Sequence, residues 1–480
     1  MNFLAVDFGA GSGRAIVGSI EKDCLNLEEI HRFPNRQIKL GNSLVWDFPA
    51  LFEELKTSIK LALQKYKKIE SIAVDTWGVD FGLLDSKGSL IGMPVCYRDN
   101  RTNNIPELVF EKISPQKLYS LSGTQQMEIN TIFQLYSMCL NDSPYLKIAE
   151  SLLFMPDLFN YFLCGKKSNE YTIASTSGLL NCNSKKWDDD IFSGLQLPKH
   201  LMQNVNRPGE IIGQLSPEIC KEINCNPINI VSVGSHDTAS AVSIVNSTKK
   251  NRAFISSGTW SILGISCKNP ITSDLAFSNN FTNEGGIWDD IRFQRNITGL
   301  WLLQSVCKEW GINDFSSLVN DAKKSNKFQA IFDVDNPIFA NPQSMSNTIT
   351  EYCNKTKQKQ PGTKGEFVRT ILESLAVKYG VILKKLENTV GYNVDEIQVI
   401  GGGSQNDLLC QLTADICKVP VLAGPVEATA IGNIMTQALS QNQISKDEFF
   451  NNNNLPFESK IYYPENEFKW ENLNENIELW

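Results

Sequence analysis

The stretch Val6-Asp7-Phe8-Gly9-Ala10-Gly11-Ser12-Gly13-Arg14 decides how the N-terminal part of the chain folds. It joins two apolar segments, 3–7 and 15–20, which we predict to be strands. A short glycine-rich turn between two strands makes a hairpin. The dinucleotide-binding G-x-G-x-x-G motif instead needs a strand followed by a helix. The sequence therefore predicts a hairpin and argues against that motif.

The same arrangement begins again about 250 residues later. Predicted strands at 252–255 and 260–265 are joined by the turn Ser256-Ser257-Gly258-Thr259. Both turns consist of small residues and carry hydroxyl groups. Two such units, each opening one half of the chain, predict two similar α/β lobes. The polar segment 246–251 is the predicted boundary, which gives an N-terminal lobe at 1–246 and a C-terminal lobe at 247–480.

Helices and further strands are predicted within the two halves. Asp47 precedes a helix that has Pro49 in its first turn and apolar residues at helical spacing. Buried strands are predicted at 71–75 and 396–400, and the second runs into the glycines 401–403. The other predicted helices are 239–245, 298–309, 365–387 and 407–417.

Composition excludes several classes of protein. The 480 residues include 45 lysines and arginines against 53 aspartates and glutamates, a net charge of −8, so no basic footprint for nucleic acid is present. Twelve cysteines without a C-x-x-C pair, and only three histidines, argue against a structural zinc site. The N-terminus lacks a positive leader, and no apolar run is long enough to span a membrane. We expect a cytoplasmic protein.

Glycine-rich turns have a chemical use, because their backbone N–H groups can approach an anion closely. The turn from Ala10 to Arg14 adds a serine hydroxyl and an arginine, and the turn from Ser256 to Thr259 adds three hydroxyls. Each turn alone favours an ordinary tight hairpin. Together, opening matching halves, they favour a shared site for phosphate groups.

Three further features have two interpretations each. Asp7 ends a strand just before the first turn, where it either holds Mg²⁺ or caps the turn. Gly401 to Gly403 lie between a strand and a helix, which favours a flat platform for a ligand over a bare linker. Asp237 is either a helix N-cap or a general base that takes a proton from a hydroxyl group. His236 either packs in the core or contacts the substrate. The charged segment 97–102 favours a salt-bridged surface turn over the rim of a sugar site.

An ordered series of motifs resembles the FGGY family of carbohydrate kinases, and among its members those that act on L-rhamnulose. The series covers nearly the whole chain, from residue 6 to about residue 433. It consists of Val6 to Arg14, Asp75 to Asp85, Tyr97-Arg98-Asp99, Ser235 to Val242, Ser256 to Ser261, Thr282-Asn283-Glu284-Gly285-Gly286, Asn296 to Gln304, Gly401 to Asn406 and Ala423 to Ala428.

The resemblance implies an α/β fold of the sugar-kinase/Hsp70/actin (ribonuclease H-like) type, with two lobes and a cleft between them. It implies ATP-dependent phosphorylation of L-rhamnulose at its 1-hydroxyl, giving L-rhamnulose 1-phosphate and ADP, with Mg²⁺ and with Asp237 as general base. The N-terminal lobe would bind the sugar and carry the first phosphate turn, and the C-terminal lobe would bind ATP. The implied ATP contacts are Ala10, Gly11, Ser12, Gly13, Arg14, Thr259, Gln304 and Gly402, and the implied sugar contacts are Gly78, His236, Asp237, Thr238 and Asn296.

One departure from the family pattern is visible in the first turn. Relatives that act on this sugar carry Gly-Ala-Ser-Ser-Gly-Arg there, and Gly11 replaces the first serine in this chain. One hydroxyl donor is lost while the backbone donors remain. We expect changed nucleotide affinity at most.

The sequence leaves other functions open. A kinase for another ketose, such as L-fuculose or L-xylulose, differs only in a few pocket side chains. A non-catalytic regulator that binds sugar and nucleotide belongs to a different class, and Asp7, Asp237 and Thr259 argue against it. The roles of Arg98 and Glu427 stay undecided. The expected partners are a ketose and ATP, without nucleic acid or membrane, and the expected state is a monomer or weak homodimer.

Overall fold

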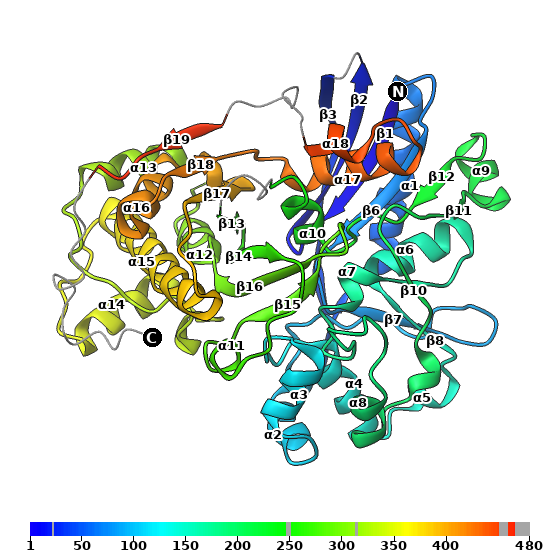
Figure 1. The fold of residues 1–480 in the computed structure, drawn as a ribbon, viewed down its shortest axis with the longest axis horizontal. Helices are drawn as coiled ribbons and strands as arrows, with labels where there is room; N and C mark the ends of the chain where they lie inside the picture. The colour runs from blue at the N-terminus through cyan, green and yellow to red at the C-terminus, as the bar shows by residue number, and fades with distance from the viewer. Residues whose placement is uncertain (22–23, 246–250, 313–314, 451–458, 466–480) are drawn as a thin grey trace. The chain divides into compact units, whose positions relative to one another are not determined.

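The computed structural model describes residues 1–21, 24–245, 251–312, 315–450 and 459–465, which form two compact units (Figure 1). Unit 1 comprises Met1–Ile244, Ser266–Phe293 and Ala428–Pro456. Unit 2 comprises Val245–Ile265, Gln294–Glu427 and Phe457–Trp480. The predicted division at 246/247 lies outside the described residues and stays a prediction. Neither unit is continuous along the sequence.

A six-stranded sheet forms the centre of unit 1, in the order β11-β12-β6-β1-β2-β3. The predicted hairpin is confirmed, because β1 pairs antiparallel with β2 in a register that sets Asp7 opposite Arg14. β6 and then β12 continue the sheet in parallel. The strands of this sheet are β1 (Asn2–Phe8), β2 (Ser12–Glu21), β3 (Cys24–Pro34), β6 (Ser71–Thr76), β11 (Ile211–Gln214) and β12 (Asn229–Val231).

Helices cover both faces of this sheet. On one face, α1 (Phe48–Lys65) and α6 (Met155–Cys164) share a hydrophobic core with the inward side chains of β1 and β6. Asp47 caps α1 as expected, and its carboxylate accepts the Ala50 N–H. On the other face lies α17 (Ala428–Ser440), which packs against β1, β6 and α10 (Asp237–Val242). The sheet is therefore buried on both sides, as its uninterrupted apolar strands require.

The other elements of unit 1 are short. Its additional strands are β4 (Gln37–Leu40), β5 (Ser43–Trp46), β7 (Phe81–Leu84), β8 (Ser151–Phe154), β9 (Asn169–Glu170), β10 (Val205–Asn206) and β15 (Thr282–Gly285). Its additional helices are α2 (Ile105–Phe110), α3 (Pro115–Ser122), α4 (Thr131–Leu140), α5 (Pro144–Ile148), α7 (Tyr171–Ala174), α8 (Asp189–Gly194), α9 (Pro217–Ile223), α11 (Asp274–Ser278) and α18 (Lys446–Phe450).

The second sheet has the order β15-β16-β14-β13-β17-β18-β19. Its central hairpin is antiparallel, and β17 and then β18 follow in parallel. β19 closes the far edge antiparallel to β18, as β11 does beside β12 in unit 1. The predicted restart of the hairpin pattern is thus confirmed. The strands are β13 (Arg252–Ser257), β14 (Trp260–Cys267), β16 (Ile291–Thr298), β17 (Glu396–Ile400), β18 (Val421–Ala423) and β19 (Lys460–Tyr462).

Unit 2 is mainly helical around this sheet. Its longest helix, α15 (Lys364–Val390), begins at a capping box in which Thr363 and Glu366 satisfy each other's backbone N–H groups. The other helices are α12 (Trp301–Glu309), α13 (Phe315–Lys324), α14 (Met345–Lys355) and α16 (Asp407–Cys417).

The boundaries of two predicted helices are wrong. The helix predicted at 298–309 begins only at Trp301, because Thr298 ends β16 and Gly299 lies against the Trp260 backbone, where a Cβ would come within 2.5 Å of it. The helix predicted at 239–245 begins earlier, at Asp237, and ends at Val242. His236 is its N-cap residue, so Asp237 is not.

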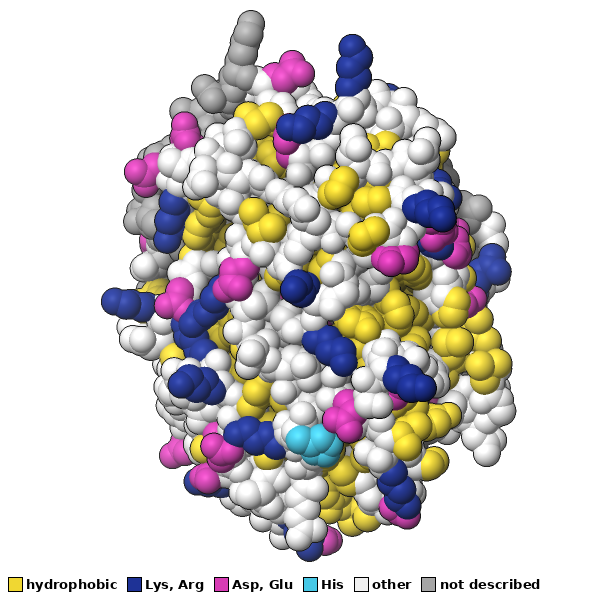
Figure 2. Space-filling model, turned by 90° about the vertical axis from the view of Figure 1, so that its right-hand side faces the viewer, with side chains coloured by type: hydrophobic (Ala, Val, Ile, Leu, Met, Phe, Trp, Pro, Cys, Tyr) yellow, Lys and Arg dark blue, Asp and Glu magenta, His cyan; other side chains and the backbone are white. Residues whose placement is uncertain are grey.

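The surface carries charges of both signs. Figure 2 shows basic and acidic side chains interspersed over the face that it draws, without a broad basic area. Among the residues described, no helix has both the length and the apolar character needed to cross a bilayer.

Candidate functional site

The turn between β1 and β2 presents its tip to solvent. Gly11 and Ser12 are exposed, and a Cβ added at Gly11 would meet nothing within 4 Å. Asn35 stabilises the turn with two hydrogen bonds. Its Nδ2 donates to the Gly9 carbonyl at 2.9 Å, and its backbone N–H donates to the Gly11 carbonyl at 3.2 Å. Glycine in place of serine at position 11 therefore removes a hydroxyl group without changing the packing of the turn.

The base of this turn carries an ion pair. Arg14 Nε and Nη2 lie 3.1 and 3.0 Å from Asp7 Oδ2. Gly13 is buried against the Phe33 ring, which a Cβ would approach to 2.2 Å, and Ala10 is half-buried beside the core. The turn is therefore packed at its base and exposed at its tip.

The corresponding turn of unit 2 brings two predicted ATP contacts together. Thr259 Oγ1 donates to Gln304 Oε1 at 3.3 Å. The start of α12 is tied to the turn, because the Leu300 N–H donates to Gly258 O and the Trp301 N–H to Thr259 O. Gln304, one turn into this helix, is thereby placed beside Thr259.

The glycines after β17 lie against the same hairpin. A Cβ at Gly403 would come within 2.0 Å of Ser257 Oγ, and Gly401 has φ +81, which a side chain would strain. Gly402 is exposed, with open space around it. Asn406 caps the following helix α16 by accepting the Leu409 N–H. Of these glycines, Gly402 is thus the exposed one, while Gly403 is buried against Ser257.

Three carboxylates of unit 1 interact near the ends of neighbouring strands. Asp7 and Asp75 are register partners on β1 and β6, and Asp237 begins α10. Burial, together with the charges of Asp7 and Asp237, holds the pKa of Asp75 well above its usual range. Asn433 on α17 donates to Asp75 Oδ2 at 2.5 Å. The site thus concentrates negative charge where little solvent can screen it.

Asp237 is held by the residue that follows it. The backbone N–H and Oγ1 of Thr238 both donate to Asp237 Oδ1, at 2.5 and 3.0 Å. Oδ2 forms no hydrogen bond with any residue that the structure describes. Burial raises the pKa of Asp237, while the neighbouring His236 opposes that shift. The carboxylate is therefore oriented and keeps one oxygen available.

Of the predicted sugar contacts, four lie together in unit 1. His236 Nε2 lies 3.6 Å from Asp237 Oδ1. A Cβ built at Gly78 would come 3.5 Å from His236 Nε2, so the glycine leaves space above the ring. Asn296 lies on β16 within unit 2, half-buried.

The predicted surface turn at 97–102 is wrong. Tyr97 and Asp99 are buried, and Asp99 accepts the Leu44 and Arg101 N–H groups. Asp80, which sequence reasoning missed, explains the burial, because its carboxylate accepts the Tyr97 N–H and both indole N–H groups of Trp46 and Trp77. Burial raises the pKa of Asp80 to about 6. This network fixes the loop that contains Gly78.

Other buried groups that the sequence did not single out hold the loop before Asp237. Glu170 accepts the Ser235 N–H at 3.2 Å, and Thr172 Oγ1 accepts the His236 N–H at 3.2 Å. Burial raises the pKa of Glu170 to about 7. Glu284 and Arg292 contact the His236 ring. Glu284 lies inside a quoted motif, so its position was visible in the sequence, but its partner was not.

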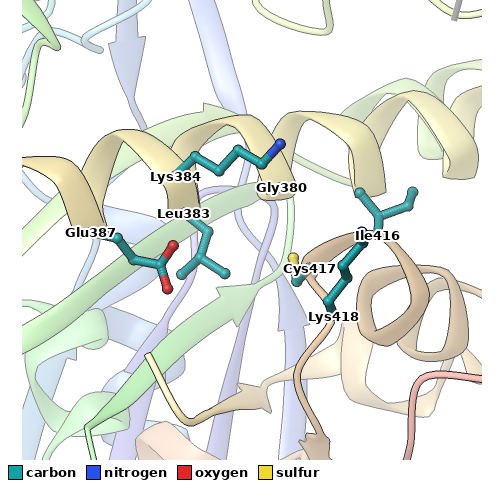
Figure 3. A pocket seen from close by; sticks show the side chains of 7 residues that line it. All are labelled: Gly380, Leu383, Lys384, Glu387, Ile416, Cys417 and Lys418. Carbon is teal, nitrogen blue, oxygen red and sulfur yellow. The ribbon is translucent and has the colours of Figure 1, made fainter. Parts of the chain in front are cut away.

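A separate cavity of about 120 Å³ lies between α15 and α16 in unit 2 (Figure 3). None of the predicted site residues lines it. Its walls are Gly380, Leu383, Lys384, Glu387, Ile416, Cys417 and Lys418.

Comparison with known proteins gives a consistent result over both halves of the chain. Residues 2–243 match the model of the N-terminal domain of the FGGY family of carbohydrate kinases, and residues 253–440 match that of its C-terminal domain. A rhamnulokinase of Bacteroides thetaiotaomicron is 40% identical over 473 residues, which cover 98% of this chain and 97% of the relative. A rhamnulokinase of Halalkalibacterium halodurans is 40% identical over 446 residues, which cover 92% of this chain and 95% of the relative.

Solved structures agree on the fold. A xylulose kinase from Lactobacillus acidophilus superposes with a TM-score of 0.78 at 14% identity, covering 97% of this chain and 94% of the other. Plasmodium falciparum glycerol kinase with ADP gives a TM-score of 0.77 at 15% identity, covering 96% and 94%. The predicted two-domain α/β sugar-kinase fold is confirmed.

Proposed function

Since the chain belongs to the FGGY family of carbohydrate kinases, we propose that it transfers the γ-phosphoryl group of ATP to the 1-hydroxyl of L-rhamnulose, giving L-rhamnulose 1-phosphate and ADP. The predicted family and the predicted class of enzyme, a carbohydrate kinase, are confirmed. The choice of sugar is supported by full-length relatives at about 40% identity that are rhamnulokinases.

One observation carries the chemical proposal. Asp237 is half-buried, its Oδ1 is fixed by Thr238, and its Oδ2 has no hydrogen-bond donor among the residues described. A general base needs an oriented oxygen with a free lone pair and a pKa raised toward the working pH. Asp237 takes the proton of the 1-hydroxyl as this oxygen attacks the γ-phosphorus, and ADP leaves.

ATP binding rests on the two turns and the glycine platform. Backbone N–H groups from Ala10 to Arg14, with the Ser12 hydroxyl, bind phosphate oxygens, and Thr259 and Gln304 contribute side-chain groups. Gly402, exposed and with open space where a Cβ would lie, lets the nucleotide lie against the backbone.

Mg²⁺ fits beside Asp7. Asp75 Oδ1 is buried and has no hydrogen-bond partner in the part of the chain that the structure describes, and the adjoining carboxylates repel each other, so a cation would stabilise the pair. No cluster of three or more ligating side chains occurs within the described ranges, so water and phosphate oxygens would complete the coordination. A bound Mg²⁺ would neutralise charge on the phosphates.

The sugar is held by Gly78, His236, Thr238 and Asn296. A second candidate is another ketose, L-fuculose or L-xylulose, because pocket side chains alone decide among such similar substrates. We place the reaction in the cytoplasm, in a monomer or weak homodimer.

The first test replaces the base. Asp237→Asn keeps the shape but cannot accept the proton, so kcat should fall by about 10²–10⁴-fold while ATP still binds. Sugar-dependent ADP release by a coupled assay and ATP binding by calorimetry measure the two effects. Asp142→Asn, which changes an exposed carboxylate paired with Lys147, is the control and should keep the wild-type rate.

The choice of sugar and the role of Asp237 are tested by different results. L-Rhamnulose should give the highest kcat/KM in a panel with L-fuculose and L-xylulose. Near wild-type turnover of Asp237→Asn would refute the base, whereas no ADP release with any of the ketoses would refute the function.

The pH dependence of the rate gives an independent check. The base must be ionised, so kcat/KM for the sugar should rise with pH through the pKa of Asp237. Because burial raises this pKa above the ordinary value of 3.8, the rising limb should lie above that value. A rate that stays flat from acid to neutral pH would contradict the assignment.

A further inference from the structure

The segment 170–176 comprises α7 and the residues beside it, and the mechanism described so far does not use it. The hydroxyl groups of Thr172, Ser175 and Thr176 are buried there. Each accepts a backbone N–H from a different part of unit 1: Thr172 from His236 at 3.2 Å, Ser175 from Gly285 at 2.8 Å, and Thr176 from Val79 at 3.2 Å. This segment therefore holds the backbone of three stretches of chain around the proposed sugar contacts.

Thr172 differs from the other two residues in the group that takes its proton. Ser175 and Thr176 donate to main-chain carbonyls of the same segment, at 2.7 and 2.8 Å. Thr172 Oγ1 instead donates to Glu170 Oε2 at 2.6 Å. A backbone N–H can only donate, so the Thr172 oxygen accepts from His236 while its single proton goes to Glu170. The direction of both hydrogen bonds is thus fixed.

The carboxylate of Glu170 is fully buried and accepts four hydrogen bonds. They come from the Thr172 hydroxyl and from the backbone N–H groups of Thr172, Ile173 and Ser235. All four groups are donors, which suits the ionised form. Burial raises the pKa of Glu170 to about 7, and these hydrogen bonds oppose that shift. Glu170 is therefore ionised in mildly alkaline solution.

The position of Glu170 is fixed by contacts outside the segment. Its backbone N–H donates to both carboxylate oxygens of Asp157 on α6, at 3.1 and 3.2 Å. β9, which ends at Glu170, pairs in parallel with β10. Since α6 shares the hydrophobic core of the first sheet, these contacts connect Glu170 to the best-packed part of unit 1.

The backbone that Glu170 holds leads directly to Asp237. His236 is the N-cap residue of α10, and Asp237 is the first residue of that helix. Glu170 accepts the Ser235 N–H itself and holds the His236 N–H through Thr172. Two consecutive backbone groups before Asp237 therefore depend on one carboxylate. A displacement of about 1 Å at a reacting group can cost on the order of 10²-fold in rate, so their position matters for the reaction.

We propose that Glu170, acting through Thr172, is a positioning residue that holds the backbone of Ser235 and His236 and thereby sets where the carboxylate of Asp237 lies. The effect on catalysis rests on the proposed function, in which Asp237 is the general base. The hydrogen bond between Thr172 and the His236 N–H does not.

This hydrogen bond is tested without measuring activity. Protein labelled with ¹⁵N-histidine shows backbone amide signals of His31, His200 and His236, and His236→Asn assigns the last. The wild-type His236 amide should exchange slowly with deuterium, because it is buried and hydrogen-bonded. Thr172→Val keeps the shape but removes the hydroxyl, so exchange should be about tenfold faster, and Thr172→Ser should restore the slow rate. A wild-type amide that exchanges as fast as in an unfolded chain overturns the proposal, whether or not any variant folds.

Kinetics test whether Thr172 acts through Asp237. At about pH 8, where Glu170 is ionised, Thr172→Val should lower kcat about tenfold and leave the KM for ATP within about twofold. Thr172→Ser should keep most of the wild-type kcat. In an Asp237→Asn background, Thr172→Val should have no further effect on kcat, because the positioned group no longer takes the proton. An unchanged kcat in Thr172→Val, or full additivity of the two substitutions, contradicts the proposal.

Glu170→Gln tests the carboxylate itself. An amide has one accepting oxygen, and its NH₂ group would face N–H donors, so kcat should fall at least as far as in Thr172→Val. Exchange of the His236 amide should be faster as well, because the Thr172 hydroxyl is no longer held by a charged acceptor. A wild-type kcat in a folded Glu170→Gln protein contradicts the role of Glu170.

Thr413→Val is the matched control. Thr413 on α16 is 1% exposed, and its hydroxyl donates to the Leu409 carbonyl at 2.7 Å, so the change removes a buried hydroxyl from unit 2. It should leave kcat and the exchange of the His236 amide unchanged. If it lowers kcat as Thr172→Val does, the effect is one of general stability and the proposal fails. If the wild type phosphorylates no ketose, the proposed function fails, while amide exchange still decides whether Thr172 holds His236.

Discussion

At the scale of single residues, the site depends on glycines, which have no side chain, as well as on its polar side chains. Gly78, which is half-buried, and Gly285, which is buried, both lie near His236, but they are surrounded differently. A Cβ at Gly78 would make ordinary contacts of 3.4–3.5 Å with Thr176 and His236, whereas one at Gly285 would come within 2.4 Å of the Tyr171 ring. One glycine leaves space for a ligand, and the other allows two elements to approach.

The two glycines therefore give opposite predictions. Gly78→Ala should leave the Tm nearly unchanged but raise the KM for the sugar about tenfold or more, because the methyl group would lie 3.5 Å from Nε2 of His236, a proposed sugar contact. Gly285→Ala should cost about 1–3 kcal/mol of stability, since the ring cannot yield easily. Thermal unfolding and sugar kinetics on both variants separate the effects. A destabilised Gly78→Ala with an unchanged sugar KM would refute this distinction.

The sequence located some of these residues and not others, for a physical reason. Asp237 and the two turns lie in local motifs, so the ordered series that resembles the kinase family selected them as candidates. Glu284, Arg292 and His236 meet only because β15 and β16 bring residues 48 and 56 positions away to one ring. Asp80 likewise gathers donors from Trp46 and Tyr97, so the burial of 97–102 was not predictable from its own charge.

At the scale of elements, α17 is the helix whose placement matters most. Its buried face carries Asn433, which donates to Asp75, and Gln437, which donates to the Leu4 carbonyl and accepts from Ser71 Oγ. Gly432 allows this helix to touch α10, since a Cβ there would come within 1.9 Å of the Ser240 carbonyl oxygen. Hydrogen bonds of buried polar side chains thus join α17 to β1 and β6, the strands that carry Asp7 and Asp75.

Removing the Asn433 side chain should lower the stability of the folded protein by an amount that depends on pH. Asn433→Ala removes a donor that stabilises the charged form of Asp75, so the pKa of Asp75 in the folded protein rises further. The ionised carboxylate is then less stable in the folded state, and the loss of about 1–3 kcal/mol should grow as the pH rises from acid. Thermal unfolding at several pH values measures it. Gln443→Ala, an exposed change after the helix, is the control, and an equal loss at every pH would contradict the explanation.

Elements were easier to predict than their limits. The apolar periodicity of α1 and α16 and the uniform burial of β1, β6 and β17 appear directly in the sequence. The early start of α10 and the late start of α12 were not predictable, because both depend on backbone contacts with distant segments.

At the scale of the whole molecule, the spatial units cross the sequence halves. Unit 1 takes residues 266–293 and 428–456 from beyond the predicted boundary. Without these segments, the sheet of β1 and β6 lacks the α17 cover, and both Asp75 and Ser71 lose their hydrogen-bond partners. The hairpin repeat was visible in the sequence, whereas this exchange of segments is a tertiary property.

A fragment of residues 1–246 should therefore not fold by itself. We expect weak near-UV circular dichroism and no cooperative unfolding transition, because an apolar sheet face and buried polar groups are exposed. Co-expression with 247–480 should restore both signals and kinase activity. A fragment that unfolds cooperatively alone would show that α17 and β15 are dispensable for unit 1.

The return of α17 to the first sheet also has a consequence for synthesis. A ribosome adds about 5–20 residues per second, so the roughly 200 residues between β12 and the end of α17 take on the order of ten to forty seconds to appear. During that interval the nascent chain has made its first sheet but not the helix that covers it. Chaperones that recognise apolar strands should therefore engage this polypeptide until α17 has left the exit tunnel.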